Sequence, residues 1–413
     1  MQNIIRCGYL ILVMLVQKKL PNGCRMVIER RSSPIVCVQI SVGVGSDDEN
    51  LRVAGISHFL EHMLFEGSTT RTTKEISEAI ENVGGELNAA TSNERTFYYA
   101  KVPRKHFAMA LEILADVVFN PIFDQKMMEK ERNVILEEIK MTDDQPLQYQ
   151  WILFEKTLWK KLPAKNPTYG TVETVKAITR KDMIDYHQRW YSPQNIIVSV
   201  VGDAPDAERE IKRWFDRRES TAVPELPEVT EPVDNRALVK REKKGVQQAY
   251  MNFGYKTVAR SHPDSVVLDV ISAVFCKGLS GRIVDEIRIR RGLVYSVGCT
   301  HQSLGSFGFF AVYLNAAKKN IEPCRGIILQ EIGKLSTLSK RELDEAKDFI
   351  EGKLVMSAED HQHRADILAF WESVSSAKDA EHYLTKVKKV TKEDILKAAK
   401  RYLNKNYTMT VVE

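Results

Sequence analysis

The sequence contains an internal repeat, and this feature limits the possible folds more than any other. The segment at 175–191 (VKAITRKDMIDYHQRWY) recurs 212 residues later at 387–403 (VKKVTKEDILKAAKRYL), with five of the 17 paired positions identical. Thr179 and Thr391 occupy equivalent positions, where a threonine can cap the N-terminus of an amphipathic helix. Such a period is far longer than that of a solenoid and predicts two similar domains.

Strand and helix patterns follow the same order in both halves. Each copy of the repeat runs into a strand-like segment, 195–201 and 406–412, and upstream runs at 96–102 and 309–314 also predict strands. Two helical patterns follow each upstream run, and we expect these helices at 104–118, 124–141, 321–335 and 339–356. The mixture predicts an α+β fold of two homologous α/β sandwich domains, whose mainly antiparallel sheets are covered by helices.

A stretch with three prolines and no helical or alternating pattern, residues 219–234, separates the halves and is typical of a semi-extended linker. We therefore expect a first domain at 17–218, a linker at 219–235 and a second homologous domain at 236–413. The 60 Lys+Arg and 55 Asp+Glu residues give a net charge of only +5, which does not favour nucleic acid as a ligand. We interpret the basic runs at 236–244 and 282–291 as solvated faces.

The cysteines and the N-terminus bear on the cellular compartment. Six cysteines are scattered without any CxxC pair, so we expect no disulfide framework and a reducing, cytoplasmic location. The apolar segment 4–16 is interrupted by Arg6 and is too short to span a bilayer. It could be a signal core, but no small-residue cleavage site follows. We favour two other interpretations over export. The segment is either a first strand or the product of a translation start placed too far upstream of Met14.

The segment at 55–65 (GISHFLEHMLF) carries the residues best suited to chemistry. We expect Ser57 to cap a helix that begins at His58. His58 and His62 are then separated by four residues on one face, a spacing that lets two imidazoles bind one zinc ion. Glu61 lies close enough to take a proton from a metal-bound water. This His-x-x-Glu-His order is the inverted form of the commoner zinc-protease motif.

A catalytic zinc site also needs a third protein ligand. The helix expected at 124–141 offers Glu131, Glu137 and Glu138. Glu131 and Glu138 are two helical turns apart and share a face, where a carboxylate is costly unless it is paired or metal-bound. Glu137 points about 100° away and is expected to be solvated. Taken alone, two histidines and a glutamate on an amphipathic helix also occur without any metal.

Together these residues resemble the motif of the insulinase/pitrilysin family of zinc peptidases, which includes the mitochondrial processing peptidases and half-size bacterial relatives. The resemblance extends from about Lys18 to the C-terminus. In that family a glutamate follows the second histidine by about 76 residues, which matches Glu138 here. A supporting glutamate lies seven residues before that glutamate, which matches Glu131. Residues 84–99 also resemble the strand pair beside the family's metal. The resemblance implies one Zn2+ per chain, held by His58, His62 and Glu138, with Glu61 activating the metal-bound water and Glu131 in support.

The second half has a different motif. Residues 279–297 resemble the family's substrate-clamping segment, in which an arginine precedes a tyrosine by seven, here Arg288 and Tyr295. The resemblance implies that both approach the zinc site and polarise the scissile carbonyl. The alternative is an ordinary basic helix end. The positions equivalent to the two histidines are Val270 and Val274, so the halves are expected to have specialised for metal and for substrate.

The resemblance thus implies a zinc metalloendopeptidase that hydrolyses peptides or unfolded segments. A chain of this size supplies half of the family's chamber, so we expect a homodimer, with a heterodimer of related chains as the alternative. The strand edge at 86–92 is expected to capture the peptide as an added strand. The alternative function is a non-catalytic structural or partner subunit. Residues 361–363 (HQH) have a spacing that separates their rings, and we expect them on the surface.

Overall fold

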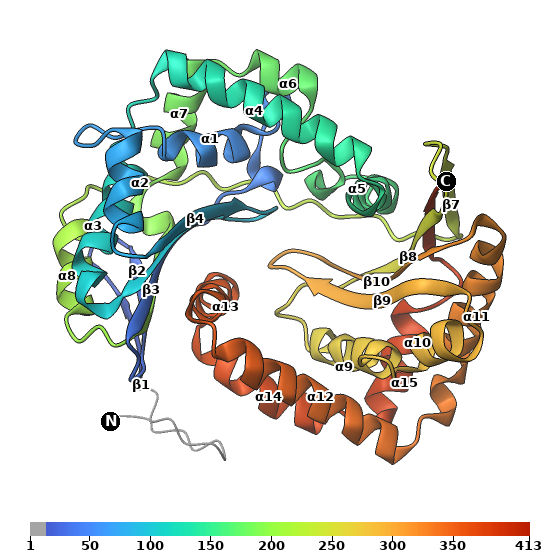
Figure 1. The fold of residues 1–413 in the computed structure, drawn as a ribbon. Helices are drawn as coiled ribbons and strands as arrows, with labels where there is room; N and C mark the ends of the chain where they lie inside the picture. Colours follow the sequence, from blue (N-terminus) through green and yellow to red (C-terminus); the bar gives the residue numbers. More distant parts are fainter. Residues whose placement is uncertain (1–13) are drawn as a thin grey trace. The chain divides into compact units, whose positions relative to one another are not determined.

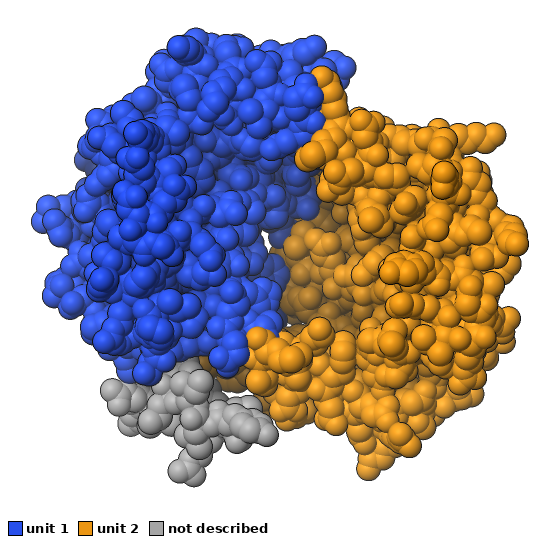
Figure 2. Space-filling model, viewed as in Figure 1, with its two compact units in different colours: residues 1–139, 167–228, 357–380 blue, residues 140–166, 229–356, 381–413 orange. Residues whose placement is uncertain are grey.

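The computed structural model describes residues 14–413, which form two compact units (Figures 1 and 2). Of the described residues, unit 1 comprises 14–139, 167–228 and 357–380, and unit 2 comprises 140–166, 229–356 and 381–413. Of the apolar N-terminal segment, residues 4–13 lie outside the described part, while Met14 opens the first strand.

Unit 1 is built on a six-stranded sheet with the order β1-β2-β6-β3-β5-β4. Only the β2–β6 pair is parallel. The strands are β1 (Met14–Lys19), β2 (Arg25–Arg30), β3 (Ile35–Val42), β4 (Glu86–Thr91), β5 (Thr96–Pro103) and β6 (Ile196–Gly202). The strand β4 therefore lies at one edge of the sheet, as expected for residues 86–92.

Unit 2 is built on a five-stranded sheet with the order β7-β11-β8-β10-β9. Its strands are β7 (Leu238–Glu242), β8 (Ala249–Thr257), β9 (Val294–Ser303), β10 (Gly308–Ala316) and β11 (Thr408–Val412). Only β7–β11 is parallel. This order reproduces β2-β6-β3-β5-β4 of unit 1 strand for strand, which confirms the duplication.

Helices cover both sheets. In the first half of the chain they are α1 (Ile56–Leu64), α2 (Thr73–Glu81), α3 (Phe107–Phe119), α4 (Gln125–Asp144), α5 (Pro146–Leu158), α6 (Val172–Ala177), α7 (Arg180–Trp190) and α8 (Ala207–Phe215). In the second half they are α9 (Asp264–Cys276), α10 (Arg282–Val284), the π-helix η6 (Asp285–Arg290), α11 (Ile321–Gly333), α12 (Lys340–Ala358), α13 (His361–Val374), α14 (Lys378–Lys389) and α15 (Lys392–Tyr402). The expected α+β class and the four expected helices are confirmed.

The repeated segments form the same local structure in both halves. The side chain of Thr179 accepts a hydrogen bond from the backbone N–H of Asp182 at the start of α7. Thr391 accepts the equivalent bond from Asp394 at the start of α15. Each helix then leads to a buried strand, β6 or β11. The predicted threonine caps are confirmed, and they explain why both helices begin where they do.

Each half of the chain contributes one helix to the sheet of the other half. Helix α13 comes from the second half but packs on β3 and β6 of unit 1, where Leu368 joins Cys37 and Ile197 in a small apolar cluster. Helix α5 comes from the first half but packs on β8 and β11 of unit 2, where Phe154 contacts Phe309. The two helices hold equivalent places in the repeat, so the exchange is reciprocal. It explains why the inner strands β6 and β11 are buried along their whole length.

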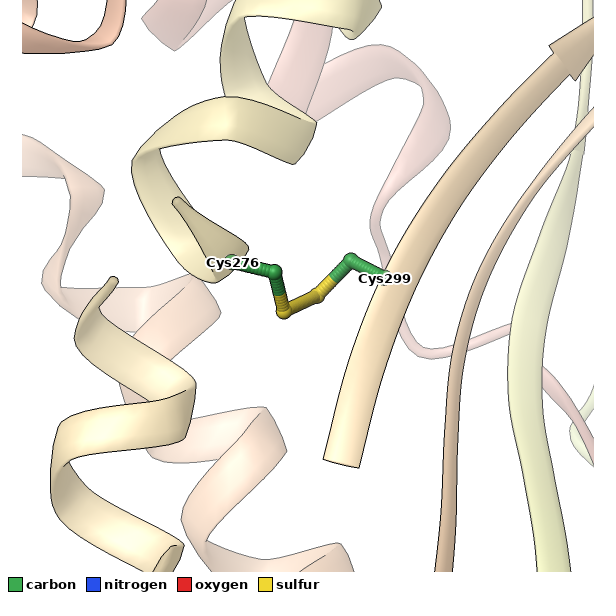
Figure 3. Close-up of a disulfide and its surroundings, with 2 residues drawn as sticks. All are labelled: Cys276 and Cys299. Atoms are coloured by element: carbon green, nitrogen blue, oxygen red, sulfur yellow. A yellow bond between two sulfur atoms is a disulfide. The ribbon is translucent and has the colours of Figure 1, made fainter. Parts of the chain in front are cut away.

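The cysteines differ from the expectation. Cys276 at the end of α9 is joined by a disulfide to Cys299 on β9 (Figure 3), a single pairing among the described residues, which the expectation of no disulfide framework did not foresee. The pair spans 23 residues and has no CxxC spacing, so only the packing of α9 beside β9 brings the two sulfurs together. Among the described residues the free cysteines are Cys24, Cys37 and Cys324, all buried.

The described residues contain no helix long and apolar enough to cross a membrane. The cytoplasmic location stays a prediction.

Candidate metal centre

Helix α1 presents the His-x-x-Glu-His residues within unit 1. It begins at Ile56 with Gly55 as the N-cap residue, so the expectation that Ser57 caps a helix starting at His58 is wrong. The buried Ser57 hydroxyl instead shares a 2.8 Å hydrogen bond with the hydroxyl of Tyr186 on α7. Ser57 thereby ties α1 to a neighbouring helix rather than capping it. The strongly apolar residues of α1, such as Phe59 and Leu60, are fully buried, which leaves the polar motif residues on the opposite side.

The two histidines and Glu138 converge, as the spacing predicts. The rings of His58 and His62 lie 4.8 Å apart between centroids. The Oε2 atom of Glu138, on α4, lies 3.8 Å from Nε2 of His58 and 3.7 Å from Nε2 of His62. These separations are close to those between neighbouring ligands of a tetrahedral zinc with bonds of about 2.0–2.2 Å. Glu137 is exposed, in agreement with the prediction for it.

The donor set itself fits a cation. Nδ1 of His62 lies 3.1 Å from Oε2 of the buried Glu131. Because a carboxylate accepts hydrogen bonds, this contact favours the tautomer with the proton on Nδ1, in which Nε2 presents a lone pair. That lone pair faces the Glu138 carboxylate, so two acceptors meet without a proton donor between them. A divalent cation resolves this repulsion, and Glu131 is placed to orient a ligand.

Burial also sets the charge state of the site. Desolvation, and secondly the charge of His62, lowers the pKa of His58 to about 4. The ring is therefore neutral near pH 7, as a metal-binding imidazole must be. Its Nδ1 atom is buried without a hydrogen-bond partner in the described part of the chain. Its other ring nitrogen, Nε2, lies 3.8 Å from Oε2 of Glu138, within the candidate site.

Glu61 is held beside the two histidines by a residue that the sequence analysis did not single out. The hydroxyl of Thr91, the last residue of β4, donates a 2.6 Å hydrogen bond to Oε2 of Glu61. Burial raises the pKa of Glu61, while this hydrogen bond and the neighbouring His62 oppose the rise. A carboxylate of increased basicity that is fixed in one orientation is suited to accept a proton.

A buried arginine joins α4 to α1. The guanidinium of Arg132 lies over the ring of Phe59 at 5.2 Å from its centroid. It also donates hydrogen bonds to the backbone carbonyls of Val175 and Ile178, the latter at 2.9 Å. Arg132 is adjacent to Glu131, so this contact places the helix that carries Glu131 and Glu138 against the helix that carries the histidines (Figure 1).

In unit 2 the structure brings Arg288 and Tyr295 together. The Arg288 guanidinium lies 5.8 Å from the centroid of the Tyr295 ring, and the tyrosine is 78% exposed. Arg288 belongs to the π-helix η6, which ends at Arg290 shortly before Gly292, whose φ is 58°, so the basic helix end stays open as the alternative. Such π-helical turns occur frequently at functional sites.

His361, expected on the surface, is buried at the start of α13.

In unit 2 the helix equivalent to α1 has valines where α1 has its two histidines. Helix α9 takes the same place in the repeat, and its Val270 and Val274 are buried in the apolar core. Sequence comparisons agree with this division. The profile described as "Insulinase (Peptidase family M16)" matches residues 25–172, and the profile described as "Peptidase M16 inactive domain" matches residues 177–349. The chain belongs to the insulinase family.

Curated members of the insulinase family resemble this chain over most of its length. An uncharacterized zinc protease of Bacillus subtilis is 32% identical over 342 residues, which cover 82% of this chain and 83% of the relative. One from Mycobacterium leprae is 32% identical over 401 residues, covering 95% of this chain and 90% of the relative. A solved structure described as a protease from Helicobacter pylori shares the fold, with a TM-score of 0.91, 23% identity and coverage of 97% and 100%. The family assignment from the motif is thereby confirmed.

Sequence reasoning missed Thr91, Arg132 and Tyr186. Each contacts α1 from a segment far away in the sequence. Thr91 lies inside the segment 84–99 that the resemblance marked, but nothing in its spacing links it to Glu61. No signal in the sequence pointed to Arg132, because its burial appears only in the structure.

Proposed function

We propose that this chain is a zinc-dependent endopeptidase that hydrolyses peptides or unfolded protein segments. The observation that supports this most is the convergence of His58 Nε2, His62 Nε2 and Glu138 Oε2. Helix α1, which carries both histidines, also presents the Glu61 carboxylate. Zinc bound there would polarise a carbonyl and lower the pKa of a coordinated water.

The chain's own residues divide the remaining work. Glu61 would accept the proton of the attacking water and later return it to the leaving amine, while Thr91 keeps its carboxylate in one orientation. Glu131 would hold the proton on Nδ1 of His62. Arg288 and Tyr295 supply donors suited to a developing oxyanion.

Peptide binding would use the edge strand β4. Its free side can pair with an extended peptide through backbone hydrogen bonds, which gives affinity without demanding a particular sequence. We further propose a homodimer, with a heterodimer as the alternative. The alternative function, a non-catalytic subunit, is disfavoured because a scaffold would have no need of a buried carboxylate beside two histidines.

The deciding experiment compares Glu61→Gln with the parent chain. We expect the variant to retain one zinc per chain while the rate of peptide cleavage falls by about 10²–10⁴-fold, the usual contribution of a general base. Metal content is measured on the same samples as cleavage, and mass spectrometry of the products separates internal cleavage from trimming of the ends. A variant with activity within a few-fold of the parent would exclude Glu61 as the base.

A further inference from the structure

The helix that carries the metal-binding motif is anchored from outside the motif. Its N-cap residue, Gly55, has no side chain to accept hydrogen bonds from the first turn. Glu49 takes this role. Its Oε2 atom accepts the backbone N–H of Gly55 at 2.6 Å, and its Oε1 atom accepts the backbone N–H of Ser57 at 2.8 Å. Both oxygens of the Glu49 side chain therefore accept hydrogen bonds from backbone N–H groups at the start of α1.

The start of α1 has little room to move. Gly55 adopts a left-handed conformation with φ of 94°, and a Cβ atom there would lie 2.4 Å from the carbonyl oxygen of Tyr169. The helix start therefore lies between the Tyr169 backbone and Glu49. A shift of this point would move His58 first, because His58 lies in the first turn of α1.

The segment that carries Glu49 also contacts the turn that follows β4. The backbone N–H of Ser46 donates to the carbonyl of Ser92 at 3.1 Å, and the N–H of Asp47 donates to the carbonyl of Asn93 at 2.8 Å. The Asn93 side chain returns a 3.1 Å hydrogen bond to Asp47. Residues 45–49, here called the connecting segment, thus join this turn to the start of α1.

The connecting segment thereby links two parts of the candidate site. One end binds the turn next to Thr91, whose hydroxyl orients Glu61. The other end binds the helix that presents Glu61 and both histidines. We propose that Glu49 is a positioning residue of the metal centre, whose carboxylate sets the place of α1 relative to β4 and so the geometry of the zinc ligands. This inference rests on the proposed zinc site.

If Glu49 were only an ordinary helix cap, it would make the same hydrogen bonds, and its loss would lower stability without a specific effect on metal binding. The chain offers a matched control in α2, which has nine residues like α1 and belongs to the same unit. The carboxylate of Glu75 accepts the backbone N–H of Thr72 at 2.8 Å at the start of α2. Helix α2 carries no residue of the candidate site, so Glu75→Gln measures the cost of losing a helix-capping carboxylate alone.

The test compares Glu49→Gln and Glu75→Gln with the parent full-length chain. The zinc dissociation constant is measured on metal-free protein by competition with a chromogenic chelator. We expect Glu49→Gln to weaken zinc binding by about 10-fold or more, as loss of outer contacts to metal ligands does, while Glu75→Gln stays within about 2-fold of the parent. Hydrogen exchange of the Gly55 and Ser57 amides should become faster in Glu49→Gln only. It reports on the same contacts without metal or activity.

The outcomes separate this inference from the proposed function. If Glu49→Gln binds zinc as tightly as the parent, or if both variants weaken it equally, Glu49 is not a positioning residue, although the zinc site stands. If the parent itself binds no zinc, the proposed function and this inference fail together. Glu49→Ala, which removes both acceptors without an isosteric replacement, should weaken zinc binding further. An Ala variant that binds zinc like the parent overturns the proposal even if Glu49→Gln folds poorly.

Discussion

The hydroxyl of Thr91 donates a 2.6 Å hydrogen bond to the Glu61 carboxylate and so connects the edge strand β4 to the helix that carries both histidines. A hydrogen bond to a charged group contributes about 1.5–3 kcal/mol. We expect Thr91→Val, which keeps the shape but loses the donor, to lower kcat by about 10-fold or more while zinc content is unchanged. Thr91→Ser restores the hydroxyl and should recover most of the rate. Equal rates for Val and Ser would show that the hydroxyl has no role.

The third zinc ligand is tested by comparing three glutamates of α4. Glu138→Gln should reduce zinc affinity most, since a charged ligand is lost. Glu131→Gln should lower zinc affinity by about 10–100-fold, because Glu131 contacts the ligand His62 rather than the metal. Glu137→Gln is the control, as Glu137 is exposed on the same helix. Full zinc content in Glu138→Gln at limiting zinc would remove Glu138 from the ligand set.

The role proposed for Arg288 and Tyr295 predicts a loss of cleavage without a loss of metal. Arg288→Ala and Tyr295→Phe should each cleave peptides more slowly and hold one zinc per chain, because neither residue belongs to the metal cluster.

The proposed dimer is a separate prediction. Size-exclusion chromatography with light scattering of the parent chain should show a dimer or larger form. A fully active monomer would contradict the proposed dimer.

Mixing two inactive variants tests which second half serves which zinc site. We expect the Arg288 segment to act on the zinc site of its own chain. A mixture of Glu61→Gln and Arg288→Ala chains then stays inactive, since neither chain is complete. If activity reappears, a mixed dimer has paired the intact Glu61 of one chain with the intact Arg288 of the other, and the segment acts across the dimer.

Stability at low pH should depend on a carboxylate of unit 2. Glu342 accepts hydrogen bonds from Arg282 at 2.7 and 3.0 Å, and chiefly for this reason its pKa is lowered to about 2. Because the pKa in the unfolded chain is about 4.3, the stabilisation is complete above about pH 5 and is lost as the pH falls toward 2. Glu342→Gln should therefore cost roughly 1–2 kcal/mol at pH 7, an amount reduced by solvent screening, and progressively less below pH 5. Urea unfolding at pH 7, 5 and 4 measures this difference, and a cost that does not change with pH would contradict it.

The sequence alone determined the local structure, because the interactions that decide it lie within a few residues. The threonine caps at Thr179 and Thr391 start their helices through bonds to residues three positions later. The spacing of His58 and His62 places both rings on one helix face for the same reason. The duplication was also visible in the sequence, since related sequences retain the same order of strands and helices.

Only the tertiary structure decided which distant segments meet. The exchange of α5 and α13 depends on which apolar helix face fits the uncovered side of each sheet, and several helices of this chain have such a face. Cys276 and Cys299 pair because α9 packs beside β9. Glu49 lies only six residues before Gly55, yet its role follows from a turn that no motif predicts. Thr91 reaches Glu61 because β4 packs against α1, a contact that depends on the whole of unit 1.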